Sequence, residues 1–367
     1  MEKLIYQIAI TQIKGVGNIT AKTLLAHVGS IEDIFKQSRA QLLKIPNIGE
    51  FLVTQLAKER DNAFRRAEKE IEFITKHHIT PLFFTDDAYP YRLRECDDAP
   101  VMVYAKGNQN FNTGRFVGIV GTRKLTNYGK MLCQKLIAEL SQRDITIVSG
   151  LAFGTDICAH KTALEQGLNT VGVLGHGLDR IYPDLHRPTA ARMLSQGALL
   201  TEYLSGSNPD KQNFVQRNRI IAGLVDALIV VESATRGGSL ITAEVANSYN
   251  RDVFAFPGRA NDEFSAGCNA LIRENKAALI ESAADLEKMM AWEQSTKSKN
   301  IIEPTIFAEL SDEEKQILLL IKTPDGLNIN QIALKMEMPV SRIASRLIEM
   351  EFKALVKPLP GNMYKIV

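Results

Sequence analysis

The sequence predicts a doubly wound α/β domain with a parallel sheet, preceded by a helical domain and followed by a winged-helix domain. Three observations predict this arrangement: glycine turns between helical stretches near the start, apolar strand-like runs alternating with helical segments in the middle, and three helical stretches with a hairpin pattern at the end. With 367 residues, the chain exceeds one ordinary hydrophobic core, which predicts roughly two or three domains. We expect a helical domain at 1–80, the α/β domain at 81–290, a linker at 291–305 and the winged-helix domain at 306–367.

The composition is that of a folded globular protein, with 45% hydrophobic residues. No apolar run approaches the ~20 residues that a membrane span requires, so we expect no membrane association and a cytoplasmic location. The formal net charge is only +2, so a nucleic-acid site would have to be a local patch. The scattered cysteines predict neither a zinc site nor a disulfide framework, because no two of them form a C-x-x-C pair; they are Cys96, Cys133, Cys158 and Cys268.

Two short turns between helical stretches mark the first domain. They lie in Ile13–Ala21 and Ile45–Phe51, and both resemble helix-hairpin-helix units, in which backbone N–H groups at a helix N-terminus bind a phosphate. The first turn fits better because it has Gly15 and Gly17, whereas the second has Pro46-Asn47 where the first glycine would fall. A helical bundle used only for packing or protein contacts is the alternative.

The second domain alternates short apolar runs with helical segments. The runs are rich in Val, Ile and Leu without polar alternation, which is typical of parallel strands covered on both faces. Helical segments such as Tyr128–Leu140 and Thr155–Gln166 lie between them, so we expect ligands at the carboxyl ends of the strands. The predicted strands are Phe116–Val120, Ile145–Val148, Thr170–Leu174, Ala198–Glu202, Ala227–Val231, Val253–Phe256 and Ala277–Ile280.

The last domain follows a polar linker that includes Glu293–Asn300. Three helical stretches and a β-hairpin around Pro360-Gly361-Asn362 predict a winged helix-turn-helix. Arg342 and Arg346 are four residues apart on its third helix, where one face could meet a phosphate backbone. Residues 305–367 carry no net charge, so a protein-contact or regulatory role is the alternative. The predicted elements are Asp312–Ile321, Ile329–Lys335, Val340–Met350, Leu355–Leu359 and Met363–Val367.

Three arginines in the α/β domain are candidates for binding phosphate. Arg123 follows a glycine turn, and Arg217 and Arg219 lie close to the aromatic Phe214. Guanidinium groups bind phosphate through two parallel hydrogen bonds, and an exposed ring can stack on a base. The alternative is a set of salt-bridging arginines around the sheet, since arginine usually finds a carboxylate partner.

The remaining motifs do not predict catalysis or a cofactor. Gly175 and Gly177 supply only two of the three glycines of a dinucleotide-binding fingerprint, and the sequence has no P-loop. Asp156 and His160 lie one helical turn apart, but there is no nucleophile motif beside them. We therefore expect a buried histidine held by the aspartate, no catalytic residues, no bound metal and no cofactor.

The α/β domain carries a series of motifs that begins with Gly121-Thr-Arg123, Ser149–Asp156 and Gly175–Pro183. The series continues with Thr201-Glu-Tyr203, Phe214–Leu224, Gly238–Ala243 and Pro257-Gly258. In this order they resemble the DNA-processing protein DprA (Smf) family, and the resemblance spans the whole domain. The helix-hairpin-helix-like start and the winged-helix-like end resemble the longer members of that family.

The resemblance implies a cytoplasmic protein of natural transformation with an extended Rossmann-like domain. Such proteins bind incoming single-stranded DNA, protect it from nucleases and help to load the RecA recombinase; they act as homodimers without known catalysis. By motif, the resemblance implies a basic pocket with a stacking ring and polar contacts, formed by Arg123, Lys211, Phe214, Arg217, Asn218, Arg219, Gly237, Gly238 and Ser239.

Two other functions compete with single-stranded DNA binding. A related Rossmann-like group cleaves the N-glycosidic bond of nucleoside monophosphates with a glycine-rich turn, a threonine and a glutamate, and Gly237–Glu244 loosely resembles that turn. Its Thr242 falls one residue later than in that group, and Glu244 would have to reach the sugar. A purely protein-binding adaptor is the other alternative, in which Arg123 would not affect DNA affinity.

Overall fold

The computed structural model describes residues 2–292, 311–321, 327–353, 355–359 and 362–366. It divides into two compact units, residues 1–292 and 293–367. Most of the predicted linker at 291–305 and the centre of the predicted hairpin turn, Pro360-Gly361, lie outside the described residues. The domain boundary at residue 80 stays a prediction.

The first unit begins with five helices that share one hydrophobic core. Gly17 and Gly49 are the N-cap residues of the second and fifth helices, and Gly15 has a φ of 88°, the left-handed conformation that favours glycine. The amide of Lys14 in the first turn donates to Glu59 Oε2 at 2.7 Å, so this donor already has an anionic partner. The helices are α1 (Glu2–Ile10), α2 (Asn18–Val28), α3 (Ile31–Ile34), α4 (Arg39–Leu42) and α5 (Glu50–Lys76).

A nine-stranded sheet forms the rest of the first unit, in the order β1-β2-β6-β5-β4-β3-β7-β8-β9. The seven strands from β3 onward are parallel, as predicted from their apolar runs. Two strands that were not predicted extend the sheet at one edge in the antiparallel direction, since β1 pairs antiparallel with β2, and β2 pairs antiparallel with β6. The strands are β1 (Thr80–Phe83), β2 (Met102–Gly107), β3 (Arg115–Val120), β4 (Ile145–Ser149), β5 (Asn169–Leu174), β6 (Gly197–Thr201), β7 (Ala227–Val230), β8 (Asp252–Ala255) and β9 (Ala278–Leu279).

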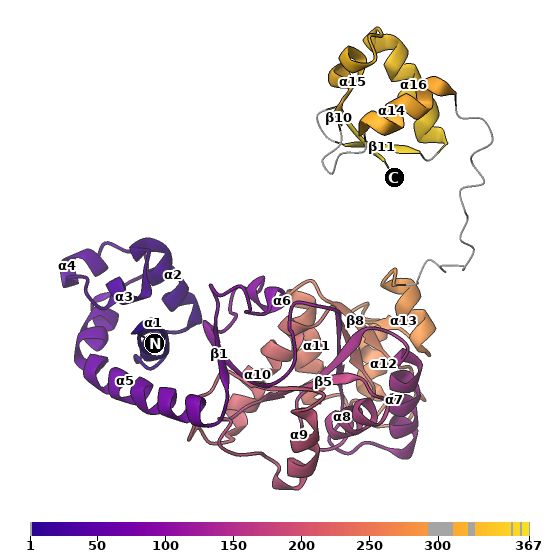
Figure 1. Cartoon of the computed structure of the whole chain (residues 1–367). Coiled ribbons are helices and arrows are strands. Elements are labelled where there is room, and N and C mark those ends of the chain that lie inside the picture. Colours follow the sequence, from indigo (N-terminus) through magenta and orange to yellow (C-terminus); the bar gives the residue numbers. More distant parts are fainter. Residues whose placement is uncertain (1, 293–310, 322–326, 354, 360–361, 367) are drawn as a thin grey trace. The chain divides into compact units, whose positions relative to one another are not determined.

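Helices cover both faces of this sheet (Figure 1). Successive side chains of a strand alternate between the faces: Phe116 and Val120 pack with the helices α10, α11 and α12, whereas Val117 and Ile119 pack with α7, α8 and α13. The doubly wound prediction is confirmed. The helices are α6 (Tyr91–Arg94), α7 (Asn127–Leu140), α8 (Thr155–Glu165), α9 (Arg187–Met193), α10 (Lys211–Leu224), α11 (Gly238–Ser248), α12 (Ala266–Arg273) and α13 (Ala283–Met289), with a 3-10 turn at Asp184–His186.

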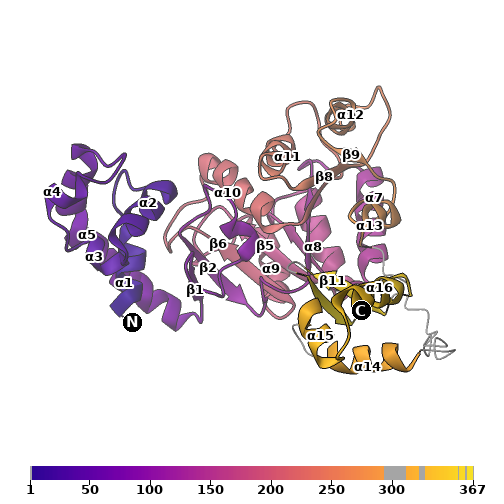
Figure 2. The ribbon, with the colours of Figure 1, turned by 90° about the horizontal axis from the view of Figure 1, so that it is seen from above.

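The five N-terminal helices pack at the β1 edge of the sheet, where both views show them (Figures 1 and 2). Phe83 of β1 and Met102 and Tyr104 of β2 belong to the same buried cluster as the helices. This edge of the sheet is thus covered by the helical region.

The second unit is a winged helix, as predicted. Within the described residues of this unit, three helices pack around Ile317, Ile332, Ile343 and Leu347, and three strands form an antiparallel sheet in the order β10-β12-β11. The two-residue strand β10 was not predicted. The elements are α14 (Asp312–Ile321), β10 (Leu327–Asn328), α15 (Ile329–Lys335), α16 (Val340–Phe352), β11 (Val356–Leu359) and β12 (Met363–Ile366).

Candidate nucleic-acid interface

A cavity of about 610 Å³ lies at the carboxyl ends of β3 and β7. These two strands are neighbours, and the chain continues from β3 to β4 on one side and from β7 to β8 on the other. Such a switch point is where open α/β sheets bind ligands, because the two following loops diverge and leave a crevice between them. We call this space the switch-point cavity; it is lined by the loops after β3, β4 and β7 and by the starts of α10 and α11.

Five cations and one carboxylate line the switch-point cavity, so its formal charge is +4. The carboxylate is Asp156. Apart from Arg217, none of these cations has an ion pair or a side-chain hydrogen bond to another part of the described chain, so their charges are not neutralised by the protein. Such a concentration of positive charge favours an anionic ligand. The cations are Arg123, Lys124, Lys211, Arg217 and Arg236.

The loop that carries Arg123 is fixed to the end of β7. The carboxylate of Glu232 accepts hydrogen bonds from the N–H and the hydroxyl of Thr126, at 3.0 and 2.5 Å. The Thr122 amide also donates to the Glu232 carbonyl at 2.8 Å. Gly121 is required here, because a Cβ atom would lie 2.4 Å from Thr155 Oγ1. The loop is therefore bound by Glu232 at the end of β7 and packed against Thr155 at the start of α8.

Arg217 is the buried member of the cation group, with 3% of its surface exposed. Its Nη1 donates to the carbonyl of Val173 at 2.6 Å, and its Nε has no hydrogen-bond partner. The guanidinium lies against Gly150, where a Cβ atom would come within 1.8 Å of Nη1. Burial lowers the pKa of Arg217 to about 10, against the opposing effect of the Asp156 carboxylate. The group remains a cation at neutral pH.

Asp156 is positioned by backbone amides rather than by His160. Its Oδ2 accepts from the N–H groups of Gly150 and Ala152, at 3.1 and 3.3 Å. The predicted Asp156–His160 contact is wrong, since His160 Nδ1 on α8 lies 2.7 Å from the hydroxyl of Thr170 on β5. The prediction that the histidine is buried is confirmed, and burial lowers its pKa to about 3.

Phe214 is half-buried at the mouth of the switch-point cavity. Its ring centroid lies 5.7 Å from that of Tyr182, with the planes tilted by 33°, and the Arg217 guanidinium lies 6.0 Å from the ring centre. Gly175 allows the ring to approach the end of β5, because a Cβ atom would lie 2.9 Å from its edge. The aromatic ring thus lies beside the Arg217 cation and lines the cavity with it.

The first residues of α11 also line the cavity. Gly237 is the N-cap of this helix, and no side chain caps its first turn, in which the Leu240 amide donates to the Gly237 carbonyl while the amides of Gly238 and Ser239 have no partner among the described residues. Ser239 donates from Oγ to Ser233 Oγ at 2.9 Å, which fixes the turn to the end of β7. Asn218 lies opposite, on α10. A helix N-terminus with free amides attracts anions.

Arg219 does not line the switch-point cavity. It lies two residues after Arg217 on α10, and its Nη2 donates to Glu202 Oε2 at 2.5 Å. The side chain of Asn18, the first residue of α2, also interacts with the carboxylate of Glu202. Burial is the main cause of the raised pKa of Glu202. The structure therefore groups Arg219 with the helical region, and a contact between Arg219 and DNA stays a prediction.

Two cations of the cavity, Lys124 and Arg236, were not predicted from the sequence. Lys124 follows Arg123 directly, and Arg236 precedes the Gly237 turn. Both are sequence neighbours of predicted site residues, and both lie close to a glycine turn. A cation close to a glycine turn is therefore the sequence signal that indicates them.

Glu244, the possible catalytic carboxylate, is not among the residues that line the cavity. Its side chain is 62% exposed on α11 and lies 3.9 Å from the ammonium group of Lys276. Thr242 lines the cavity without a carboxylate of α11 beside it. The geometry thus gives no support to the glycosidase alternative.

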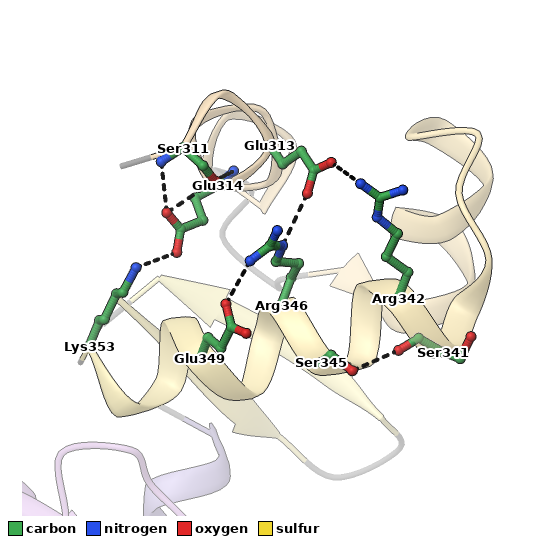
Figure 3. Close-up of polar contacts among 9 residues, drawn as sticks. All are labelled: Ser311, Glu313, Glu314, Ser341, Arg342, Ser345, Arg346, Glu349 and Lys353. Carbon is green, nitrogen blue, oxygen red and sulfur yellow. Dashed lines mark hydrogen bonds and ion pairs between the residues drawn. The ribbon is translucent and has the colours of Figure 1, made fainter. Parts of the chain in front are cut away.

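The arginines of the winged helix bind a carboxylate of their own unit (Figure 3). Glu313 on α14 accepts from Arg342 at 2.6 Å and from Arg346 at 3.0 Å, and Arg346 also pairs with Glu349. The face that was predicted as a phosphate contact is therefore neutralised within the unit.

The chain matches three described families in order along its length. Residues 8–60 match the SAM-like helix-hairpin-helix tandem, residues 80–291 match DNA recombination-mediator protein A, and residues 303–362 match the DprA winged helix domain. The middle match alone covers more than half of the chain. The chain belongs to the DprA/Smf family of DNA-processing proteins.

Relatives of the DprA/Smf family are similar over most of the chain. Protein Smf of Synechocystis is 30% identical over 98% of both chains, and the DNA processing protein DprA of Streptococcus pneumoniae is 43% identical over 55% of this chain and 71% of its own. The X-ray structure of the Streptococcus pneumoniae DprA matches with a TM-score of 0.67 and 34% identity, over 77% of this chain and 97% of that one.

A structure of DNA processing protein A from Helicobacter pylori also matches, with a TM-score of 0.53 and 29% identity over 58% of this chain and 96% of that one. That structure is described as giving insight into a single-stranded DNA binding mode of the Helicobacter protein. In the part of the chain that the structure describes, no helix is long and apolar enough to cross a membrane.

Proposed function

We propose that this protein binds single-stranded DNA in the switch-point cavity and acts on incoming strands in natural transformation. The observation that carries the proposal is a cavity at the switch point with five cations, one carboxylate and a half-buried aromatic ring. The Helicobacter relative, described as binding single-stranded DNA, supports the same ligand.

The residues of the cavity suit a single strand better than a duplex. The cations supply phosphate contacts without regard to sequence, whereas Phe214 offers a stacking surface to an unpaired base. In a duplex the faces of the bases are already stacked, so the ring has no partner there. We therefore expect binding that is selective for single strands and tolerant of sequence.

Further parts of the proposal rest on family membership. We propose that the bound strand is protected from nucleases, that the protein helps to load the RecA recombinase onto it, and that it works as a homodimer in the cytoplasm without catalysis. Among the residues that the structure describes, no three His, Cys, Asp or Glu side chains gather as a metal site.

The test is the binding of a fluorescent oligo-dT to the wild type and to Arg123→Ala over a range of salt concentrations, with duplex DNA as competitor. We expect weaker binding and a log–log salt slope that is shallower by about 0.7, the value for one lost phosphate contact on a single strand. Arg187→Ala is the matched control, since Arg187 is exposed, pairs with Asp184 and lies outside the cavity. Equal binding by both variants and the wild type would reject the cavity as the DNA site.

A further inference from the structure

The switch-point cavity holds two unoccupied donors of different kinds. The first turn of α11 presents backbone N–H groups without a side-chain cap. Arg217, which is only 3% exposed, lines the same cavity; its Nη1 donates to the Val173 carbonyl, whereas its Nη2, which is not fully enclosed, has no hydrogen-bond partner in the described part of the chain. Buried N–H groups are normally hydrogen-bonded, so an unpaired one on a cation indicates a place for an acceptor.

A group that binds both donors has to enter the cavity, because Arg217 is not accessible on the surface. A phosphodiester inside a strand has chain on both sides, which limits how closely it can approach a buried guanidinium such as that of Arg217. A terminal phosphate has chain on one side only. It also carries about −1.5 to −2 charges at neutral pH, compared with about −1 for a phosphodiester, and three free oxygens. This charge matches a cavity with a formal charge of +4.

We propose that the first turn of α11 and Arg217 form a subsite for a phosphomonoester, the group found at a phosphorylated strand end and on a free mononucleotide. The inference rests on the proposed function and specifies which part of the ligand enters the cavity. The volume of about 610 Å³ lies in the range of small-molecule sites and is sufficient for a mononucleotide-sized group. Arg123 and Arg236 line the same space and add to its positive charge.

The subsite is tested with four forms of the same oligo-dT: a 5′-phosphate, a 3′-phosphate, two hydroxyl ends, and a closed circle. We expect one phosphorylated end to raise affinity about tenfold over hydroxyl ends, the gain of one additional charge-assisted hydrogen bond. This preference should weaken below about pH 6, where the phosphomonoester loses its second charge. Competition by dTMP but not by thymidine would show that free nucleotides also bind.

A pair of variants at Gly238 separates charge from size. A Cβ atom at Gly238 has no neighbour within 4 Å and its φ is not positive, so a side chain fits there. Gly238→Asp and Gly238→Asn place side chains of almost equal size beside the first turn of α11. The carboxylate should lower the ratio of the affinities for phosphorylated and hydroxyl strand ends about tenfold more than the amide does.

The outcomes distinguish this inference from the proposed function. Equal affinity for all four strands, with no competition by dTMP, would overturn the phosphomonoester subsite while leaving single-stranded DNA binding intact. Equal effects of the two Gly238 variants would also overturn it. Absence of binding to any single strand would refute the proposed function itself. Competition by dTMP without any preference for a phosphorylated strand end would assign the subsite to free nucleotides rather than strand ends.

Discussion

Gly150→Ala tests whether the Arg217 guanidinium lies against the end of β4. The added Cβ atom would lie 1.8 Å from Nη1 and 2.5 Å from Cζ, whereas non-bonded carbon atoms pack at about 3.5–4.0 Å. The guanidinium must therefore move by about 1.5–2 Å. This movement breaks its hydrogen bond to the Val173 carbonyl, which is 2.6 Å long.

The expected loss of stability follows from these contacts. A hydrogen bond from a charged group contributes about 1.5–3 kcal/mol, and overpacking of a buried site costs about 1–3 kcal/mol. The smaller conformational entropy of the unfolded alanine chain returns about 0.4–1 kcal/mol. We expect Gly150→Ala to lower the free energy of unfolding of the first unit by about 2–5 kcal/mol.

Urea unfolding followed by the fluorescence of Trp292 measures this loss. Trp292 is the single tryptophan of the sequence, and its ring lies 5.0 Å from the Arg115 guanidinium at the end of the first unit. Gly238→Ala is the control, because its Cβ has no neighbour within 4 Å. In an Arg217→Met background, the cost of Gly150→Ala should shrink. If Gly150→Ala is as stable as Gly238→Ala, the packing of Arg217 against Gly150 is wrong.

Three further predictions concern other side chains. Phe214→Ala should weaken single-stranded DNA binding by about 1–3 kcal/mol in a titration with oligo-dT, whereas Phe214→Tyr should bind nearly as tightly as the wild type. Equal affinity of the wild type and both variants would exclude stacking on this ring. His160 has its pKa lowered to about 3 by burial, so the unfolded chain binds the additional proton and stability should fall as the pH drops from about 6.5 toward 3, by up to about 1.4 kcal/mol per pH unit. His160→Gln should flatten this part of the stability profile, and an unchanged profile would contradict the assignment. Glu313→Gln should release Arg342, while Arg346 keeps its pair with Glu349, and should make the log–log salt slope of duplex binding more negative by up to about 0.9; no gain over Glu349→Gln, which leaves both arginines paired with Glu313, would argue against DNA contact by this face.

Most of the α/β domain could be predicted because its buried strands are continuous apolar runs. All seven predicted strands are present, with ends that differ by at most one residue. The two antiparallel strands were missed for identifiable reasons. β1 has only four residues and includes Pro81, which weakens the strand pattern, and β2 pairs at the edge of the parallel set, where its run of four buried residues gives no signal of direction.

The grouping of the arginines shows what sequence order conceals. Residues two apart on an α-helix point in nearly opposite directions, so Arg217 and Arg219 cannot line one face once residues 211–224 form a helix. Helical geometry could have separated them in advance. In contrast, the partner of His160 could not be predicted, because Thr170 comes beside it only when α8 packs against β5.

The shared core of the N-terminal helices and the β1 edge has a consequence for protein engineering. Tyr104 of β2 is 2% exposed, and Leu204 belongs to the same cluster as the five helices. Removing residues 1–79 would leave these side chains open to water and the edge strand β1 without cover, a combination that promotes aggregation. A chain that begins at residue 80, where the match to DNA recombination-mediator protein A begins, would therefore be insoluble unless the newly exposed surface is redesigned with polar residues.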